Sequence, residues 1–282
     1  MLLSRITLPG LFLSQVTDKL FLDKSTLEEN KLLQEINDKN ECSLVNPSIN
    51  KLKLNQKLNN SPFIAHNIII SKLNLYFNKD NLDSSIIIDN ITIDLIKNNN
   101  IKTNNENEKN NEFNFSMISS YLHNLIISIN NIKIRILEEK TNNALYCLFI
   151  NEIKYENKLN NNDKKENDEK EKANYLFCHN KIISIGGIVL KEGYNKADEI
   201  FFNNNEKCNK VNFYTNPQIL IVIYNKIQIE INHDYYNQKL LINSINCDNL
   251  YIECIMNITQ IRNLIKFNRQ YLKNAKKEKN KN

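Results

Sequence analysis

The chain has 282 residues, which is enough for two ordinary domains or for one large β domain. It is rich in Asn, Lys and Ile but has only 4 Gly, 4 Pro and no Trp, a bias that AT-rich coding produces. With 37 basic and 32 acidic residues, the net charge of +5 is too balanced for a dedicated nucleic-acid-binding protein. Its apolar runs are also far shorter than the ~20 residues of a membrane-spanning helix.

The first forty residues predict a strand followed by a short helix. Strand-like sequence starts within the first ten residues, and residues 20–23 read as a strand end. Ser25 and Glu28 then have the spacing of a capping box, which predicts a helix running to about Ile36.

Most of the chain between residues 69 and 231 predicts β-strands, because apolar residues recur at every second position. Such alternation covers residues 69–77, 87–95, 145–155 and 183–189. In residues 124–137 the apolar phase slips between Ile129 and Ile132, and a β-bulge at Asn130 and Asn131 would account for this.

The longest alternation covers residues 219–231 and predicts one thirteen-residue strand with one apolar and one polar face. Its apolar positions, together with Ile127 and Ile129 of the earlier strand, are the candidate apolar surface. These residues are Ile127, Ile129, Ile219, Ile221, Ile223, Ile227, Ile229 and Ile231.

Few helices are expected beyond the first. Phe115, Ile118 and Leu122 suggest a short helix, and Asn257 with Gln260 is a second capping-box pattern that opens a helix carrying Ile258, Ile261, Ile265 and Leu272 on one stripe. Residues 97–112, 156–172 and 203–212 have too few apolar residues to fold, so we expect disordered insertions there. We therefore expect a single module over residues 1–272, followed by a disordered Lys-rich tail at 273–282.

The predicted fold is mainly β, with a few short helices and antiparallel pairing. A sheet with one apolar face must cover that face. Two coverings remain open from the sequence: a second sheet, which gives the closed sandwich of a non-catalytic scaffold or adaptor, or bound lipid acyl chains.

No catalytic, metal or cofactor site is predicted. The four histidines are scattered, the cysteines have no metal-ligand spacing, and the Gly186-Gly187 pair lacks the third glycine of a dinucleotide fingerprint. The glycine pair is more typical of a strand bulge or a close backbone approach.

The segment from Asn124 to Glu138 resembles the amino-terminal signature of the chorein group of bridge-like lipid-transfer proteins. The most distinctive matching residues are Asn124, Asn131, Ile132, Ile134, Arg135 and Glu138. The order of the later elements is similar to the amino-terminal region of the autophagy-related protein 2 branch, with the vacuolar protein sorting branch as the related alternative.

The resemblance implies a long, strongly curved antiparallel sheet that forms a hydrophobic groove. It implies a lipid-transfer protein rather than an enzyme, which solvates glycerophospholipid acyl chains and moves them between membranes, in autophagosome growth. Its partners would be phospholipids, the surfaces of the endoplasmic reticulum and an acceptor membrane, and scramblase or autophagy proteins. It would be a cytoplasmic protein, peripheral at endoplasmic reticulum contact sites.

Two features depart from the family. Its members begin with an apolar membrane-entering helix, whereas this chain is expected to begin with strand. Family members also form much longer rods than a chain of this length can.

Overall fold

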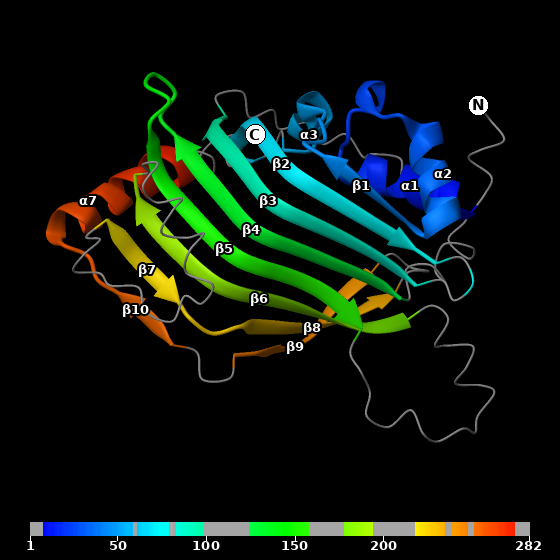
Figure 1. The fold of residues 1–282 in the computed structure, drawn as a ribbon. Coiled ribbons are helices and arrows are strands. Elements are labelled where there is room, and N and C mark those ends of the chain that lie inside the picture. The colour runs from blue at the N-terminus through cyan, green and yellow to red at the C-terminus, as the bar shows by residue number, and fades with distance from the viewer. Residues whose placement is uncertain are drawn as a thin grey trace.

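The structure of the protein is a computed structural model that describes residues 8–58, 61–78, 80, 83–98, 124–157, 178–193, 218–234, 239–247 and 251–273. These residues form one ten-stranded sheet with four α-helices (Figure 1). The prediction of a mainly β fold is confirmed. The predicted helix at 115–122, most of the predicted insertions and nearly all of the tail lie outside the described residues.

The strands are long in the middle of the sheet and short at its edges. They are β1 (Glu41–Val45), β2 (Phe63–Phe77), β3 (Ser84–Lys97), β4 (Leu125–Leu137), β5 (Ala144–Asn157), β6 (Cys178–Glu192), β7 (Ile219–Ile223), β8 (Ile227–Asp234), β9 (Lys239–Asn246) and β10 (Ile252–Cys254). The helices are α1 (Leu8–Lys19), α2 (Glu29–Lys39), α3 (Lys51–Lys57) and α7 (Ile258–Phe267).

The strand order is β1-β2-β3-β4-β5-β6-β7-β10, with β8 between β6 and β9. Neighbours are antiparallel except β3 and β4, which are parallel. The prediction of antiparallel pairing is therefore wrong at this one pair. Parallel neighbours need a connection of a dozen residues or more, and residues 98–124 provide one.

The sheet twists but is neither closed nor strongly curled, so the strong curvature expected from the resemblance is not found (Figure 1). The described strands all belong to this single sheet. Helices lie over the two ends of its apolar face, as described below, so the sheet does not need to close on itself to cover those ends.

The predicted strand at 219–231 is two strands, because the chain breaks at Tyr224 to Lys226 between β7 and β8. The break lies opposite Gly187 of β6, since β8 pairs with β6 up to Ile185 and β7 pairs with it from Ile188 onward. Gly187 has φ +59°, which interrupts the pleat of β6 at the same level.

This interruption crosses five neighbouring strands. Each of β2 to β6 has one residue at this level that is not paired in the strand register, although the residues on both sides of it are. Together we call these residues the polar row: Ser71, Asn90, Asn131, Asn151 and Gly187. Asn90 and Asn131 have positive φ, and Nδ2 of Asn131 donates to Oδ1 of Asn90 at 3.1 Å.

The phase slip predicted in residues 124–137 is therefore present at Asn131. It is not a bulge against a neighbour, however, because the adjacent strands slip at the same level and no strand has an extra residue there.

The amino-terminal region differs from its prediction. Residues 8–19 form helix α1 rather than strand, and in residues 20–23 only Leu22 makes an isolated bridge, to Ile49. The helix predicted to end near Ile36 is present as α2, but its N-cap is Glu28 without a side-chain cap. Instead, Asp23 accepts a hydrogen bond from the Ser25 amide.

Helix α7 begins as predicted. The Asn257 side chain accepts from the amide of Gln260, and the Gln260 side chain accepts from the amide of Asn257, both at 2.9 Å.

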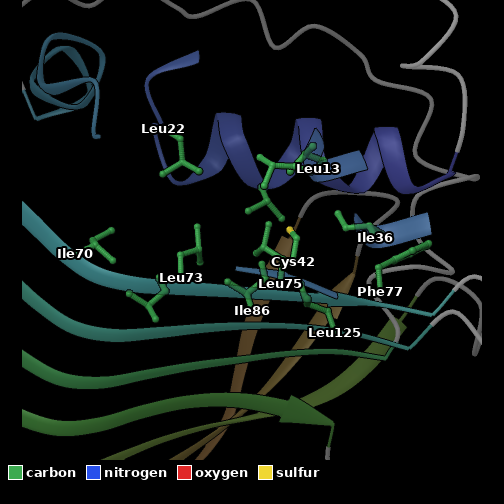
Figure 2. Packing of buried hydrophobic residues seen from close by; sticks show 13 residues of the cluster. Leu13, Leu22, Ile36, Cys42, Ile70, Leu73, Leu75, Phe77, Ile86 and Leu125 are labelled. Atoms are coloured by element: carbon green, nitrogen blue, oxygen red, sulfur yellow. The ribbon is translucent and has the colours of Figure 1, made fainter. Parts of the chain in front are cut away.

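The main core lies between α1, α2 and one end of the sheet (Figure 2). Leu13 and Ile36 of the helices pack with Leu73, Leu75 and Phe77 of β2, and the rings of Phe12 and Phe77 stack at 5.1 Å. A second cluster lies on the other face, with Cys147, Phe149, Val189, Ile219 and Val222.

Candidate functional site

One face of the sheet is built almost entirely from isoleucine. Directly paired residues on neighbouring strands lie on the same face, so the strand registers define cross-strand rows. Four successive rows are apolar from β2 to β7 or β8, and we call them together the isoleucine face: Leu75, Ile86, Ile127, Tyr155, Ile183 and Ile229; Leu73, Ile88, Ile129, Ile153, Ile185 and Ile227; Ile70, Ile91, Ile132, Ile150, Ile188 and Ile223; and Ile68, Ile93, Ile134, Leu148, Leu190 and Ile221.

The four rows share one face although the polar row separates the second from the third. Ile70, Leu73 and Leu75 pack in a single cluster with Ile88 and Ile91, so residues from both sides of the polar row meet. The simultaneous slip of all five strands therefore keeps the apolar surface continuous.

The isoleucine face is only partly covered in its third and fourth rows. Ile134, Ile150 and Ile188 are half-buried, whereas on the other side of β5 and β6 Cys147 is 0% and Val189 is 1% exposed. Because these strands lie inside the sheet, the exposure reflects the covering of one face and not an edge position.

Helices cover the two ends of this face. At one end α1 and α2 bury Leu73, Leu75 and Ile88 (Figure 2). At the other end Phe267, the last residue of α7, packs edge-on against Tyr146 at 4.9 Å and stacks on Phe63 at 6.2 Å. The half-buried isoleucines lie between these two coverings.

Seven of the eight predicted surface residues lie on the apolar side of the sheet. Ile127, Ile129, Ile221, Ile223, Ile227 and Ile229 belong to the isoleucine face, and Ile231 lies one row further along, paired with Lys181. The exception is Ile219, which packs in the cluster on the opposite face with Val222. A register shift between Leu190 and Lys191 puts Ile219 out of phase with Ile221.

The sequence prediction omitted the isoleucines that continue the surface across β3, β5 and β6, such as Ile91, Ile150 and Ile188. The alternation in residues 87–95, 145–155 and 183–189 was the signal that could have included them.

A buried lysine, Lys181, lies in the row next to the first row of the isoleucine face, beyond Tyr155 and Ile183. Lys181 is fully buried, donates a hydrogen bond to Oδ1 of Asn157 and lies 5.3 Å from the ring centroid of Tyr155. Burial lowers the pKa of Lys181 to about 8, because a desolvated ammonium loses its hydration.

The polar residues of the signature segment join the two parallel strands. Three of them bond the residue 41 positions earlier, Asn124 to Asp83 at 2.8 Å, Asn131 to Asn90 at 3.1 Å and Arg135 to Asp94 at 2.6 Å. Asn130, next to the signature position 131, bonds Asp89 at 2.9 Å with the same offset.

The other signature residues have separate places. Ile132 and Ile134 belong to the isoleucine face. Glu138 lies in the turn after β4, where its carboxylate accepts from Oγ1 of Thr141 at 2.7 Å.

The part of the chain that the structure describes contains no cluster of side chains suited to a metal ion. Three or more His, Cys, Asp or Glu side chains do not come together there in a metal-binding arrangement. His179 and His233, which look scattered in the sequence, occupy directly opposed positions of β6 and β8. Among the same residues, no helix has the length and apolarity needed to cross a bilayer.

Comparisons with known proteins add no family. No protein-family model matches the chain, and no curated protein matches it. One solved structure, "Crystal structure of Sex pheromone staph-cAM373 precursor", aligns with 91% of this chain and 81% of that chain at 12% identity, with a TM-score of 0.16. A TM-score this low carries no argument about fold or function.

Proposed function

We propose that the isoleucine face binds the acyl chains of glycerophospholipids and that the protein transfers lipids between membranes. The observation that carries this proposal is the continuous apolar surface across the sheet, which is only half-buried at Ile134, Ile150 and Ile188, whereas Cys147 and Val189 on the other side of β5 and β6 are buried. Apolar side chains that stay partly exposed are unfavourable in water, and acyl chains are a covering that matches their chemistry.

The energetics favour such binding without any covalent step. Each methylene removed from water contributes about 0.8 kcal/mol, so a two-chain lipid gains strongly from contact with the face. The face offers many similar isoleucine contacts and few polar ones, so a bound chain can slide along it at little cost. The zwitterionic or charged head group would stay at the solvent side.

The resemblance of residues 124–138 to the chorein signature supports the same function. Under this proposal the chain is an amino-terminal lipid-transfer module with a chorein-like hydrophobic groove, closest to the autophagy-related protein 2 branch. Because the sheet is not strongly curled, the lipid-binding surface of this proposal is an open one. A cytoplasmic site at endoplasmic reticulum contacts, and scramblase or autophagy partners, belong to this proposal too.

Lipid extraction by single-residue variants tests the proposal. Ile134→Asp places a carboxylate on the isoleucine face, and Ile126→Asp makes the same change on the opposite face of the same strand, where Ile126 is 40% exposed. We expect Ile134→Asp to lose most extraction of fluorescent phosphatidylethanolamine from vesicles, and Ile126→Asp to keep it. Native mass spectrometry of the wild-type protein should show bound glycerophospholipid.

Thermal unfolding of each variant separates loss of binding from loss of fold. For a variant that fails to fold, Ile134→Asn replaces Ile134→Asp in the same comparison. A folded Ile134→Asp or Ile134→Asn protein that extracts lipid as well as the wild type contradicts the proposal. A wild-type protein that carries no lipid would favour the alternative of a non-catalytic scaffold.

A further inference from the structure

Helix α7 carries an apolar stripe that points away from the sheet. Ile258, Ile261 and Ile265 are spaced three and four residues apart, so they share one face of the helix. Their exposed fractions are 69%, 43% and 48%. The opposite side of α7 is the one that packs, because Gln260 is buried and Phe267 contacts Tyr146 and Phe63.

The exposed apolar residues continue along the chain before the helix. Tyr251, Ile252 and Ile255 are each more than half exposed, and they lead directly from β10 into α7 at the edge of the sheet (Figure 1). The apolar surface therefore lies at one end of the molecule.

The charges beside this stripe are all positive. Arg262, Lys266 and Arg269 are exposed, and residues 258–273 contain no Asp or Glu. The sequence continues with Lys276, Lys277, Lys279 and Lys281 against the single acidic residue Glu278.

Two carboxylates on strands beside α7 already accept hydrogen bonds. Glu192 accepts from Nδ2 of Asn263 at 2.8 Å, and Glu253 accepts from the hydroxyl groups of Tyr224 and Tyr251 at 2.7 and 3.0 Å.

We propose that α7 docks this end of the protein on the surface of an anionic lipid bilayer. The stripe of isoleucines enters the boundary between head groups and acyl chains, and Arg262, Lys266 and Arg269 lie at the level of the lipid phosphates. Charge decides between this occupant and a protein partner, because a cationic, acid-free helix with an apolar stripe is complementary to an anionic bilayer. The inference does not depend on the isoleucine face, which belongs to the sheet and not to α7.

Binding to vesicles tests the docking surface directly. Wild-type protein is floated with phosphatidylcholine vesicles and with vesicles that also contain phosphatidylserine. We expect binding mainly to the second kind and weaker binding as salt is added. The triple variant Arg262→Gln, Lys266→Gln, Arg269→Gln should bind the phosphatidylserine vesicles about a hundredfold more weakly.

A matched pair of variants tests the apolar stripe. Ile258→Glu with Ile265→Glu should remove vesicle binding, whereas Leu52→Glu on α3, where Leu52 is 79% exposed, should leave it unchanged. Both replace exposed apolar helical residues, so their folding should be affected little and equally, as thermal unfolding will show.

A fluorescent reporter tests the docking surface independently of the charge variants. The chain has no Trp, so Ile265→Trp provides a single reporter, and Leu52→Trp provides its control. We expect a blue shift on phosphatidylserine vesicles for Ile265→Trp alone. The inference is overturned if neither reporter shifts, if both shift equally, or if light scattering shows that the wild type is a dimer that Ile258→Glu with Ile265→Glu dissociates.

Discussion

Arg135 and Asp94 face each other across the one parallel strand pair and form two hydrogen bonds, from Nε to Oδ1 at 2.6 Å and from Nη2 to Oδ2 at 2.8 Å. The Asp94 side chain is only 6% exposed, and Arg135 is its main charged partner. A bidentate contact of this kind also fixes the relative position of the two strands.

Replacing Arg135 by Met should therefore destabilise the fold strongly. The variant leaves the Asp94 carboxylate buried without its main partner, which we expect to lower the free energy of unfolding by about 3–5 kcal/mol. Urea unfolding measures this change. The double variant Asp94→Leu with Arg135→Met should lose less than Arg135→Met alone, and a larger loss would show that the pair is not the cause.

Gly187 and Gly186 should differ in their tolerance of a methyl group. A Cβ on Gly187 would lie 2.5 Å from Nδ2 of Asn151, and the φ of +59° is strained for any L side chain. We expect Gly187→Ala to cost about 2 kcal/mol of stability or more. Gly186→Ala meets only the flexible side chain of Lys226 at 3.3 Å, so equal losses in thermal unfolding would contradict this account.

The capping box of α7 predicts a local effect. Asn257→Ala removes the acceptor for the Gln260 amide, which should cost about 1 kcal/mol. Since α7 lies at the end of the sheet, we expect faster amide exchange in residues 258–267 and little change in β3 to β6. Asn257→Ser, which keeps an acceptor, should restore most of the protection.

Lys181 should make stability depend on pH. Its pKa is about 8 in the folded protein and 10.5 in the unfolded chain, so between these values the unfolded state binds more protons and stability rises with pH. Below pH 8 the cost of the buried charge is constant. Lys181→Met removes the titrating group. The free energy of unfolding of the wild type should therefore rise relative to that of Lys181→Met from pH 8 to 10.5.

The difference in unfolding free energy between wild type and Lys181→Met separates the effect of Lys181 from that of other titrating groups. Burial raises the pKa of Cys42 from 9.0 to about 12, so the Cys42 thiol lowers stability above pH 9 in both proteins alike. A constant difference between wild type and Lys181→Met across the range would contradict the assignment.

The long strands were predictable because isoleucine at every second position has only one arrangement that buries it, a strand with one apolar face. The break in residues 219–231 was missed because the isoleucines resume in phase at Ile227, although Asn225 interrupts them; the break lies opposite Gly187, which is on another strand. The face of Ile219 was missed for the same kind of reason, since its register is shifted against Lys191.

The parallel pairing of β3 and β4 was also hidden, because pairing direction depends on the path of residues 98–124 and not on local pattern. Helix α1 was missed because Pro9 and Gly10 argue against a helix interior, although Pro is tolerated in a first turn. The apolar surface was identified in part, since period two finds apolar faces but not which strands lie side by side.

The constant spacing of the bonds between β3 and β4 has a consequence for how the gene can change. Side-chain pairs at the start of these strands and within them, such as Asn124 with Asp83 and Arg135 with Asp94, fix their register at a constant offset. Codons gained or lost within residues 99–123 would renumber the partners without moving them, as long as enough chain remains to cross over. In a gene biased toward repeated Asn and Lys codons, the register of β3 and β4 would therefore stay the same when the length of this connection changes.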